Sequence, residues 1–234
     1  MPQGEGTSLG QVEEDKETRF ESPFVEIIVG GAGTSFRASR KDLARESAIF
    51  RDSIFRPYDD FREPVLYLRR HNPMIVELVI LWLSTGDLHL PLPNPYTRFE
   101  RRFQILAEVF VFAESFEMPN LRDDVISMTV GIGQRLGSMA SVIKKYPPPE
   151  TVKYIYAETD DFCIMRQLMV HYFVWYCGGL SFDEPWFLEL RRQVRSFDKD
   201  LVESDSRTGR NVRNLFELDS AEVCRGCRQG NGKA

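Results

Sequence analysis

One apolar segment, NPMIVELVILWLSTGDLHL at residues 72–90, constrains the fold of this chain more than any other. Its large apolar residues recur at three- and four-residue steps and cover most faces of a helix, which predicts a helix buried inside the protein. Asn72 and Pro73 suit its N-cap and first turn, and Gly86 suits a left-handed residue just past its end. Glu77 and the length of the segment argue against a membrane span, which needs about 20 apolar residues.

The composition is that of an ordinary globular protein. The 234 residues are 28% charged and 42% hydrophobic, with a formal net charge of −5. This mild acidity gives no reason to expect direct binding to nucleic acid or to a membrane surface. The first ten residues lack a cationic start followed by an apolar run, so no signal peptide is expected. The four cysteines are therefore expected to be reduced thiols of an intracellular protein that is cytoplasmic, nuclear or both.

Strand patterns flank the central helix. Residues 30–33, Gly-Gly-Ala-Gly, separate two β-branched and apolar stretches, which predicts a hairpin. Ser39 and Ser47 are placed to cap two short helices that follow the hairpin. Strands are predicted at residues 24–29, 34–38, 65–68 and 88–90.

Helical patterns dominate the chain after the proline-rich loop that follows residue 90. Helices are predicted at residues 103–113, 121–130, 152–157, 161–177 and 184–196. The aromatic side chains of the fourth helix are interpreted as core, with an open interface as the alternative. These side chains are Phe162, Tyr172, Phe173 and Trp175.

Composition divides the chain into four parts. Residues 1–22 are acidic and nearly free of apolar side chains, which predicts a disordered arm. A folded domain is expected at residues 23–131 and a helical extension at residues 132–197. Residues 198–234 are polar and are expected to form a disordered tail.

The order of the predicted elements resembles that of the BTB/POZ domain over roughly residues 23–131. It runs through a hairpin, a helix pair, a strand, a buried helix that ends in Thr85-Gly86, and a second helix pair. Residues 152–169, with an Ile-Tyr-x-x-Thr start and an Arg-Gln-Leu core, resemble the helical extension of many fungal members. The residues that carry the resemblance within the domain are Val25, Ile27, Val29, Gly30, Phe36, Ala38, Leu43, Ser47, Phe50, Leu81, Leu83, Leu88, Leu106, Ala107, Phe110, Ala113, Phe116, Met118 and Leu121.

The resemblance implies a mixed α/β (α+β) fold, in which a small mixed sheet is flanked by a cluster of helices and followed by a helical extension. It also implies a protein–protein interaction module. Members of the family form homodimers or bind other proteins, and some are substrate adaptors that bind the cullin scaffold of a ubiquitin ligase. Phe24 and Ser39 stand where dimerising members commonly carry an Asp and a His, which argues against a charged dimer pocket.

The resemblance also suggests where a partner would bind. Adaptor members often carry an apolar residue, any residue and an acid before the third strand, and Phe61-Arg62-Glu63 fits that pattern. The alternative is a solvated loop whose Phe61 packs onto the core. The predicted partner-facing edge comprises Phe50, Arg51, Phe55, Tyr58, Phe61 and Glu63.

Two short motifs suggest other chemistry. Residues 30–33 could be read as the glycine loop of a dinucleotide-binding site. Such a site needs a third glycine and a helix directly after the loop. Here Phe36 occupies the position of the third glycine, and a strand pattern follows the loop. A hairpin turn is therefore favoured. Cys224-x-x-Cys227 lacks two further ligands for a zinc site and a βαβ context for redox chemistry, so two uncoordinated thiols are expected.

No arrangement of residues favours catalysis. His71, His89 and His171 are dispersed, and His171 is expected to be a hydrogen-bonded core histidine. The arginines of residues 37–56 are interleaved with acids, which favours a solvated face over a nucleic-acid contact. The sequence thus predicts a non-enzymatic protein-binding module without cofactor, metal or small-molecule substrate. The alternatives are a nuclear transcription-regulatory scaffold that acts through partners and, less favoured, a nucleotide-binding protein.

Overall fold

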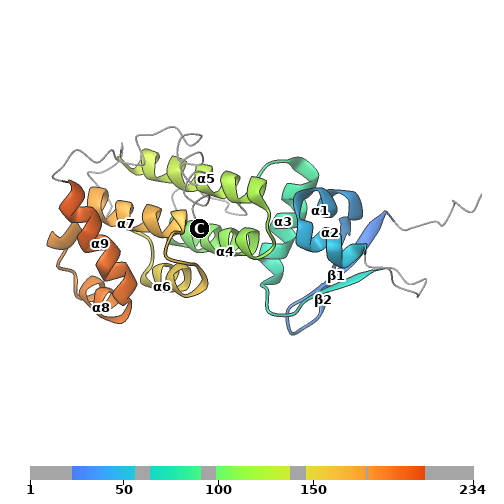
Figure 1. Ribbon diagram of the computed structural model, residues 1–234, viewed down its shortest axis with the longest axis horizontal. Helices are drawn as coiled ribbons and strands as arrows, with labels where there is room; N and C mark the ends of the chain where they lie inside the picture. The colour runs from blue at the N-terminus through green and yellow to red at the C-terminus, as the bar shows by residue number, and fades with distance from the viewer. Residues whose placement is uncertain (1–22, 56–63, 91–98, 138–145, 178, 209–234) are drawn as a thin grey trace, which may run out of the picture.

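The chain folds into a small sheet with short helices at one end and a larger array of helices at the other, as the computed structural model shows (Figure 1). The structure describes residues 23–55, 64–90, 99–137, 146–177 and 179–208. The predicted mixed α+β class is confirmed for these residues. No helix within the described ranges is long and apolar enough to cross a membrane.

The sheet contains three described strands in the order β2-β1-β3. They are β1 (Phe24–Val29), β2 (Thr34–Ser39) and β3 (Val65–Leu68). β1 pairs antiparallel with β2 and parallel with β3, so the sheet is mixed, as predicted. The hairpin turn needs glycine, because Gly30 and Gly33 both have φ of 70°. The Gly33 amide donates to the Gly30 carbonyl over 3.3 Å and closes the turn.

Two serine caps start the short helices after the hairpin, as the sequence predicted. α1 (Arg40–Glu46) begins where the Ser39 hydroxyl accepts from the Asp42 amide over 3.3 Å. α2 (Ala48–Ile54) begins where the Ser47 hydroxyl accepts from the Phe50 amide over 3.0 Å.

The central helix α3 (Pro73–Thr85) has the predicted ends, with Asn72 accepting from the Met74 amide and Gly86 at φ 77°. Most of its apolar residues are buried, although Leu81 is exposed. The strand predicted at residues 88–90 is wrong, because that segment pairs with no strand of the described sheet. Leu88 is nevertheless buried, so its pattern reflects packing rather than strand pairing.

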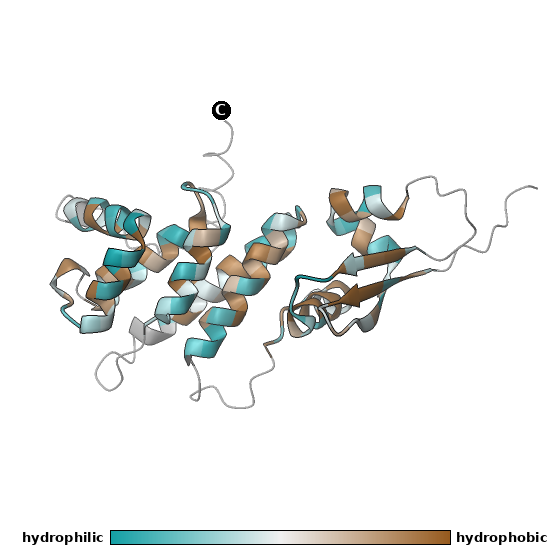
Figure 2. Cartoon of the chain, turned by 90° about the horizontal axis from the view of Figure 1, so that it is seen from below, coloured by the Kyte–Doolittle hydropathy of each residue, from teal (hydrophilic) through white to brown (hydrophobic). Residues whose placement is uncertain are grey.

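A long helical hairpin connects the two ends of the molecule (Figures 1 and 2). It consists of α4 (Phe99–Ser115) and α5 (Pro119–Gly137). At the sheet end, Phe112 and Phe116 contact Phe50 of α2. Farther along α4, Phe103 contacts Tyr172 of the extension with ring centroids 5.4 Å apart. α5 continues beyond residue 130 despite its glycines, and it packs against α7 of the extension.

The extension adds four α-helices and one short 3₁₀ helix in the described residues. They are α6 (Pro149–Glu158), α7 (Ile164–Cys177), η1 (Gly179–Ser181), α8 (Pro185–Gln193) and α9 (Arg195–Thr208). The single helix predicted at residues 184–196 is interrupted at Val194. Residues 198–208, which the sequence assigned to a disordered tail, belong to α9 instead, and the rest of that predicted tail lies outside the described residues. Phe197 and Leu201 are fully buried, and α9 packs on α7 although most of its other residues are polar.

Candidate interaction surfaces

The described part of the predicted partner-facing edge is helix α2, which has one buried and one exposed face. Ile54 lies in the core, whereas Ile49, Arg51 and Phe55 are exposed. We call these three exposed residues the α2 surface. Phe55 has half of its area, 52%, open to solvent, which is unusual for a large aromatic side chain.

Phe50 does not belong to this surface, which corrects the sequence prediction. Its side chain is 2% exposed. Its ring stacks on Phe116 with centroids 4.5 Å apart and 12° between the planes. Ser47 supports this packing, because its hydroxyl donates to the Phe116 carbonyl over 2.5 Å. Phe50 therefore anchors α2 to α4 and is inaccessible to a partner.

Arg40 covers one side of Phe55. The Arg40 guanidinium lies 4.5 Å from the centroid of the Phe55 ring and donates to the Ile54 carbonyl over 3.4 Å. The α2 surface therefore combines apolar area with positive charge. Tyr58, Phe61 and Glu63, the other predicted partner-facing residues, lie outside the described residues.

The two positions that depart from the dimerising pattern have other roles here. Ser39 caps α1, and its hydroxyl accepts from Asp42. Phe24 is 43% exposed at the start of β1, with the Arg37 guanidinium 5.0 Å from its ring centroid. Neither residue forms part of a buried charged pocket.

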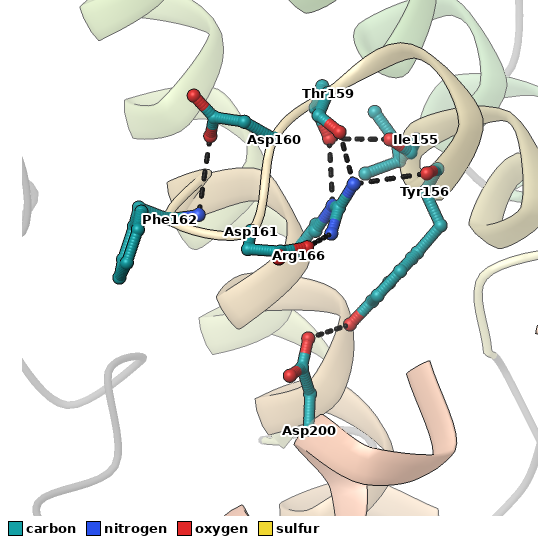
Figure 3. Close-up of polar contacts among 8 residues, drawn as sticks. All are labelled: Ile155, Tyr156, Thr159, Asp160, Asp161, Phe162, Arg166 and Asp200. Carbon is teal, nitrogen blue, oxygen red and sulfur yellow. Dashed lines mark hydrogen bonds and ion pairs between the residues drawn. The ribbon is translucent and has the colours of Figure 1, made fainter. Parts of the chain in front are cut away.

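A second exposed feature lies between α6 and α7 (Figure 3). We call residues 159–162 the Phe162 turn. Phe162 is 85% exposed, and its ring points away from Arg166 and Thr159. The Phe162 amide donates to the Asp160 carboxylate over 3.3 Å, which fixes the backbone of the turn.

Arg166 holds the Phe162 turn from inside (Figure 3). The residue is 5% exposed. Its guanidinium donates to the Asp161 carboxylate over 2.6 Å, to the Thr159 hydroxyl over 3.1 Å and to the Tyr156 carbonyl over 3.0 Å. It also donates to the Thr159 carbonyl. One buried cation thus satisfies the C-terminal carbonyls of α6 and fixes the acidic turn that follows.

The same cluster ties α9 to α6. The Tyr156 hydroxyl donates to the Asp200 carboxylate over 2.8 Å, and the Arg166 guanidinium lies 4.6 Å from the Tyr156 ring centroid. Burial, followed by the hydrogen bond to Asp200, raises the pKa of Tyr156 well above its usual range. The phenol therefore remains a hydrogen-bond donor at every physiological pH, which is consistent with a structural role.

Two of the four aromatic side chains that the sequence predicted to lie in the core around α7 are buried. Tyr172 and Phe173 are buried, whereas Phe162 precedes the helix and Trp175 is 36% exposed. The sequence signal for this difference is the Thr-Asp-Asp run before Phe162, which is typical of a turn and a helix start.

The described histidines differ in environment. His71 precedes the α3 N-cap and contacts Phe112 at 5.2 Å between ring centroids. Burial lowers the pKa of His71 from its ordinary value. His171 is not the hydrogen-bonded core histidine that was expected, because its Nδ1 has no hydrogen-bond partner among the described residues. Burial lowers the pKa of His171 to about 4.

The described residues form no recognisable site for a metal or a nucleotide. No group of three or more His, Cys, Asp or Glu side chains that could hold a metal ion occurs in the ranges that the structure covers. The glycine loop leads into β2 rather than into a helix, so its amides are not aligned with a helix N-terminus. Cys224 and Cys227 lie outside the described residues. No protein-family model matches this sequence, and no curated protein matches it.

Proposed function

We propose that this chain is a BTB/POZ-like protein-interaction module rather than an enzyme. Three features of the fold support the proposal. The hairpin is followed by two short helices, and the next strand then pairs parallel to β1. The buried helix α3 ends in Thr85-Gly86, with Gly86 in the left-handed conformation. A packed helix hairpin follows, and a helical extension completes the order.

The observation that carries the functional part is the exposure of Ile49 on α2 and of Phe55, the residue at the C-cap of α2. Both are large apolar residues, and the other side of the helix is anchored in the core by Phe50. Exposed apolar groups on a rigid element, bordered by arginine, are typical of a protein-binding surface. We infer that the α2 surface binds a protein partner, either a cullin-type scaffold or a second copy of this chain.

A binding titration tests the cullin form of this proposal. A purified cullin N-terminal domain is titrated against the wild-type chain and against a variant with Arg51→Glu and Phe55→Ser, which we call the α2 variant. The α2 variant should bind at least about tenfold more weakly, because it loses a central aromatic side chain and reverses a charge.

A matched control lies on α8, where Leu188 is 49% exposed and Arg192 is largely exposed. The changes Leu188→Ser and Arg192→Glu remove similar apolar area and alter the net charge equally, and this control variant should bind as the wild type does. Equal affinity for the wild type and the α2 variant would contradict a role for α2. A wild-type chain that binds neither the cullin fragment nor itself would contradict the proposed function.

A further inference from the structure

We propose that the outer edge of β2 binds an extended segment of another protein, which joins the sheet as a further strand with an acidic side chain opposite Arg37. The segment runs antiparallel to β2, as β1 does on the other side of that strand. The inference goes beyond the proposed function, because it concerns a strand edge and not the α2 surface. The two proposals can therefore fail independently.

The backbone of β2 alternates in the direction of its polar groups. The Arg40 amide donates to the Pro23 carbonyl over 2.9 Å. In an antiparallel ladder the same kind of pair recurs at every second position, and the register of the hairpin therefore fixes the rest. Phe36 directs its N–H and C=O at β1, whereas Ser35 and Arg37 direct theirs away from it.

The outer edge of β2 is open. β2 is the last strand on its side of the described sheet, and no described residue forms a hydrogen bond with the outward backbone groups of Ser35 and Arg37. Thr34, Ser35 and Arg37 are all exposed. Unpaired amides and carbonyls along an edge are a template for another strand, and main-chain hydrogen bonds supply most of the affinity in such complexes.

Charge specifies what the added strand carries. The Arg37 guanidinium has no ion-pair partner among the described residues and lies 5.0 Å from the Phe24 ring centroid. Glu26 stands opposite Arg37 in the hairpin, but its carboxylate accepts from the Ser35 hydroxyl over 2.6 Å. A carboxylate on the added strand, directly opposite Arg37, would supply a counter-ion, and opposite charges in such pairs stabilise strand pairing.

The residues on either side of that carboxylate should be apolar. Side chains alternate along a strand, so these neighbours point to the other face of the sheet. Phe36 and Ala38 of β2 lie on that face, where Phe36 is half-buried and Ala38 is buried. The strand that fits therefore reads apolar, acidic, apolar. β1 already places this pattern, Val25-Glu26-Ile27, opposite the same part of β2.

A second copy of this chain does not supply such a strand. The described sheet ends in β2 on one side and β3 on the other, and neither strand contains an acidic residue. β1 has the required pattern, but it is paired on both of its edges. The pattern therefore points to a segment of a different protein.

A peptide titration tests this arrangement. The probe is the fluorescently labelled peptide Ser-Thr-Val-Glu-Ile-Thr-Ser, and its anisotropy is followed as the full chain is added. It should bind with a Kd below about 1 mM. The Glu amide of the bound peptide faces β2, so N-methylation of this amide should weaken binding at least about tenfold. N-methylation of the Ile amide is the matched control and should change little, because that amide faces away from β2.

Variants of the chain test the same edge from the other side. Ser35→Pro removes one outward amide and should weaken binding at least about tenfold, whereas Ser35→Ala keeps the amide and should bind as the wild type does. Arg37→Glu should weaken binding roughly two- to fivefold, and a peptide with Lys in place of Glu should recover that loss. Both residues are exposed, so unchanged thermal melts verify that the variants are folded.

Amide exchange measured by NMR locates the bound peptide. The amides of Ser35 and Arg37 should exchange rapidly in the free chain and slowly once the peptide is added. Slow exchange in the free chain would show that this chain itself, or a second copy, already occupies the edge, which would overturn the inference.

The remaining outcomes are equally decisive. A wild-type chain that does not bind the probe would exclude the contact. Equal weakening by the two N-methyl groups, or equal affinity of Ser35→Pro and Ser35→Ala, would show that the backbone of β2 does not pair with the peptide. A charge exchange at Arg37 without effect would overturn the requirement for an acidic strand. None of these results alters the cullin titration above.

Discussion

At the scale of single residues, Arg166 is the polar side chain on which the α6–α7 connection depends most. It donates to two backbone carbonyls, one hydroxyl and one carboxylate, all within residues 156–161. Hydrogen bonds from a charged donor to buried carbonyls are stronger than average, and removal of the donor leaves those carbonyls unsatisfied. Arg166 therefore stabilises the fold and fixes the turn that carries Phe162.

Substitution of Arg166 by Met should lower the free energy of unfolding by roughly 2–4 kcal/mol, because the carbonyls of Tyr156 and Thr159 lose their donor. Urea unfolding followed by circular dichroism measures this loss. Asp161→Asn is the control. The Asp161 side chain is 85% exposed, so the change should cost less than about 1 kcal/mol. Equal losses in the two variants would contradict the assigned role of Arg166.

His171 should make the stability depend on pH. Burial lowers its pKa from 6.5 to about 4, so the folded chain keeps the imidazole neutral while the unfolded chain protonates it. Acidification then favours unfolding. The stabilisation is complete above about pH 6.5, falls as the pH decreases toward about 4, and amounts to at most about 3 kcal/mol.

A His171→Phe variant removes this titration, so its stability should decline less than that of the wild type between about pH 7 and about pH 5. Urea unfolding at several pH values in that range gives both curves. His71 and the carboxylates remain in the variant and provide the common background. Parallel curves for the two proteins would show that His171 is not protonated on unfolding in that range.

At the scale of elements, the buried indole of Trp82 joins α3 to α5. Trp82 is 5% exposed, and its Nε1 donates to the Asp124 carboxylate over 2.7 Å. Trp82→Ala should destabilise the fold by about 3–5 kcal/mol through the cavity it leaves. Trp82→Phe keeps most of the packing and should cost about 1–3 kcal/mol through the lost hydrogen bond. Urea unfolding ranks the two, and a negligible loss in Trp82→Ala would contradict a central position for α3.

Elements with strong local signals were predicted closely from the sequence. β1 has the predicted bounds, and the caps Ser39, Ser47 and Asn72 make the expected hydrogen bonds, because capping depends on residues within three positions of each other. α9 was missed because few of its residues are apolar, and only packing on α7 reveals that Phe197 and Leu201 form its buried side.

The candidate surfaces were harder to predict than the elements. Phe50 and Phe55 are both aromatic residues on or beside one short helix, and local pattern does not reveal which of them faces α4. Phe162 lies just before α7, and the turn that carries it is held by Arg166, whose side chain folds back onto that turn. In both cases the position of the side chain is set by tertiary contacts, which cannot be read from composition or periodicity.

At the scale of the whole molecule, the sheet end and the extension share the α4–α5 hairpin. Buried residues form a single hydrophobic cluster from β1 through α9, so the described parts should unfold together. The tryptophans allow a test, since Trp82 lies on α3 and Trp175 and Trp186 lie in the extension. Two variants are compared, the single variant Trp82→Phe and the double variant with Trp175→Phe and Trp186→Phe. In each variant, the unfolding transition followed by fluorescence should coincide with the one followed by circular dichroism. Separate transitions would indicate two independent units.

The central claim is that this chain works by binding other proteins through the α2 surface. The most direct measurement is its mass in solution by light scattering, at two concentrations, alone and mixed with a purified cullin N-terminal domain. The account predicts a mass above the 27.1 kDa of one chain in at least one of these conditions, and a return to the single-chain mass in the α2 variant. A wild-type monomer in every condition, or a complex that the α2 variant forms equally well, would contradict it.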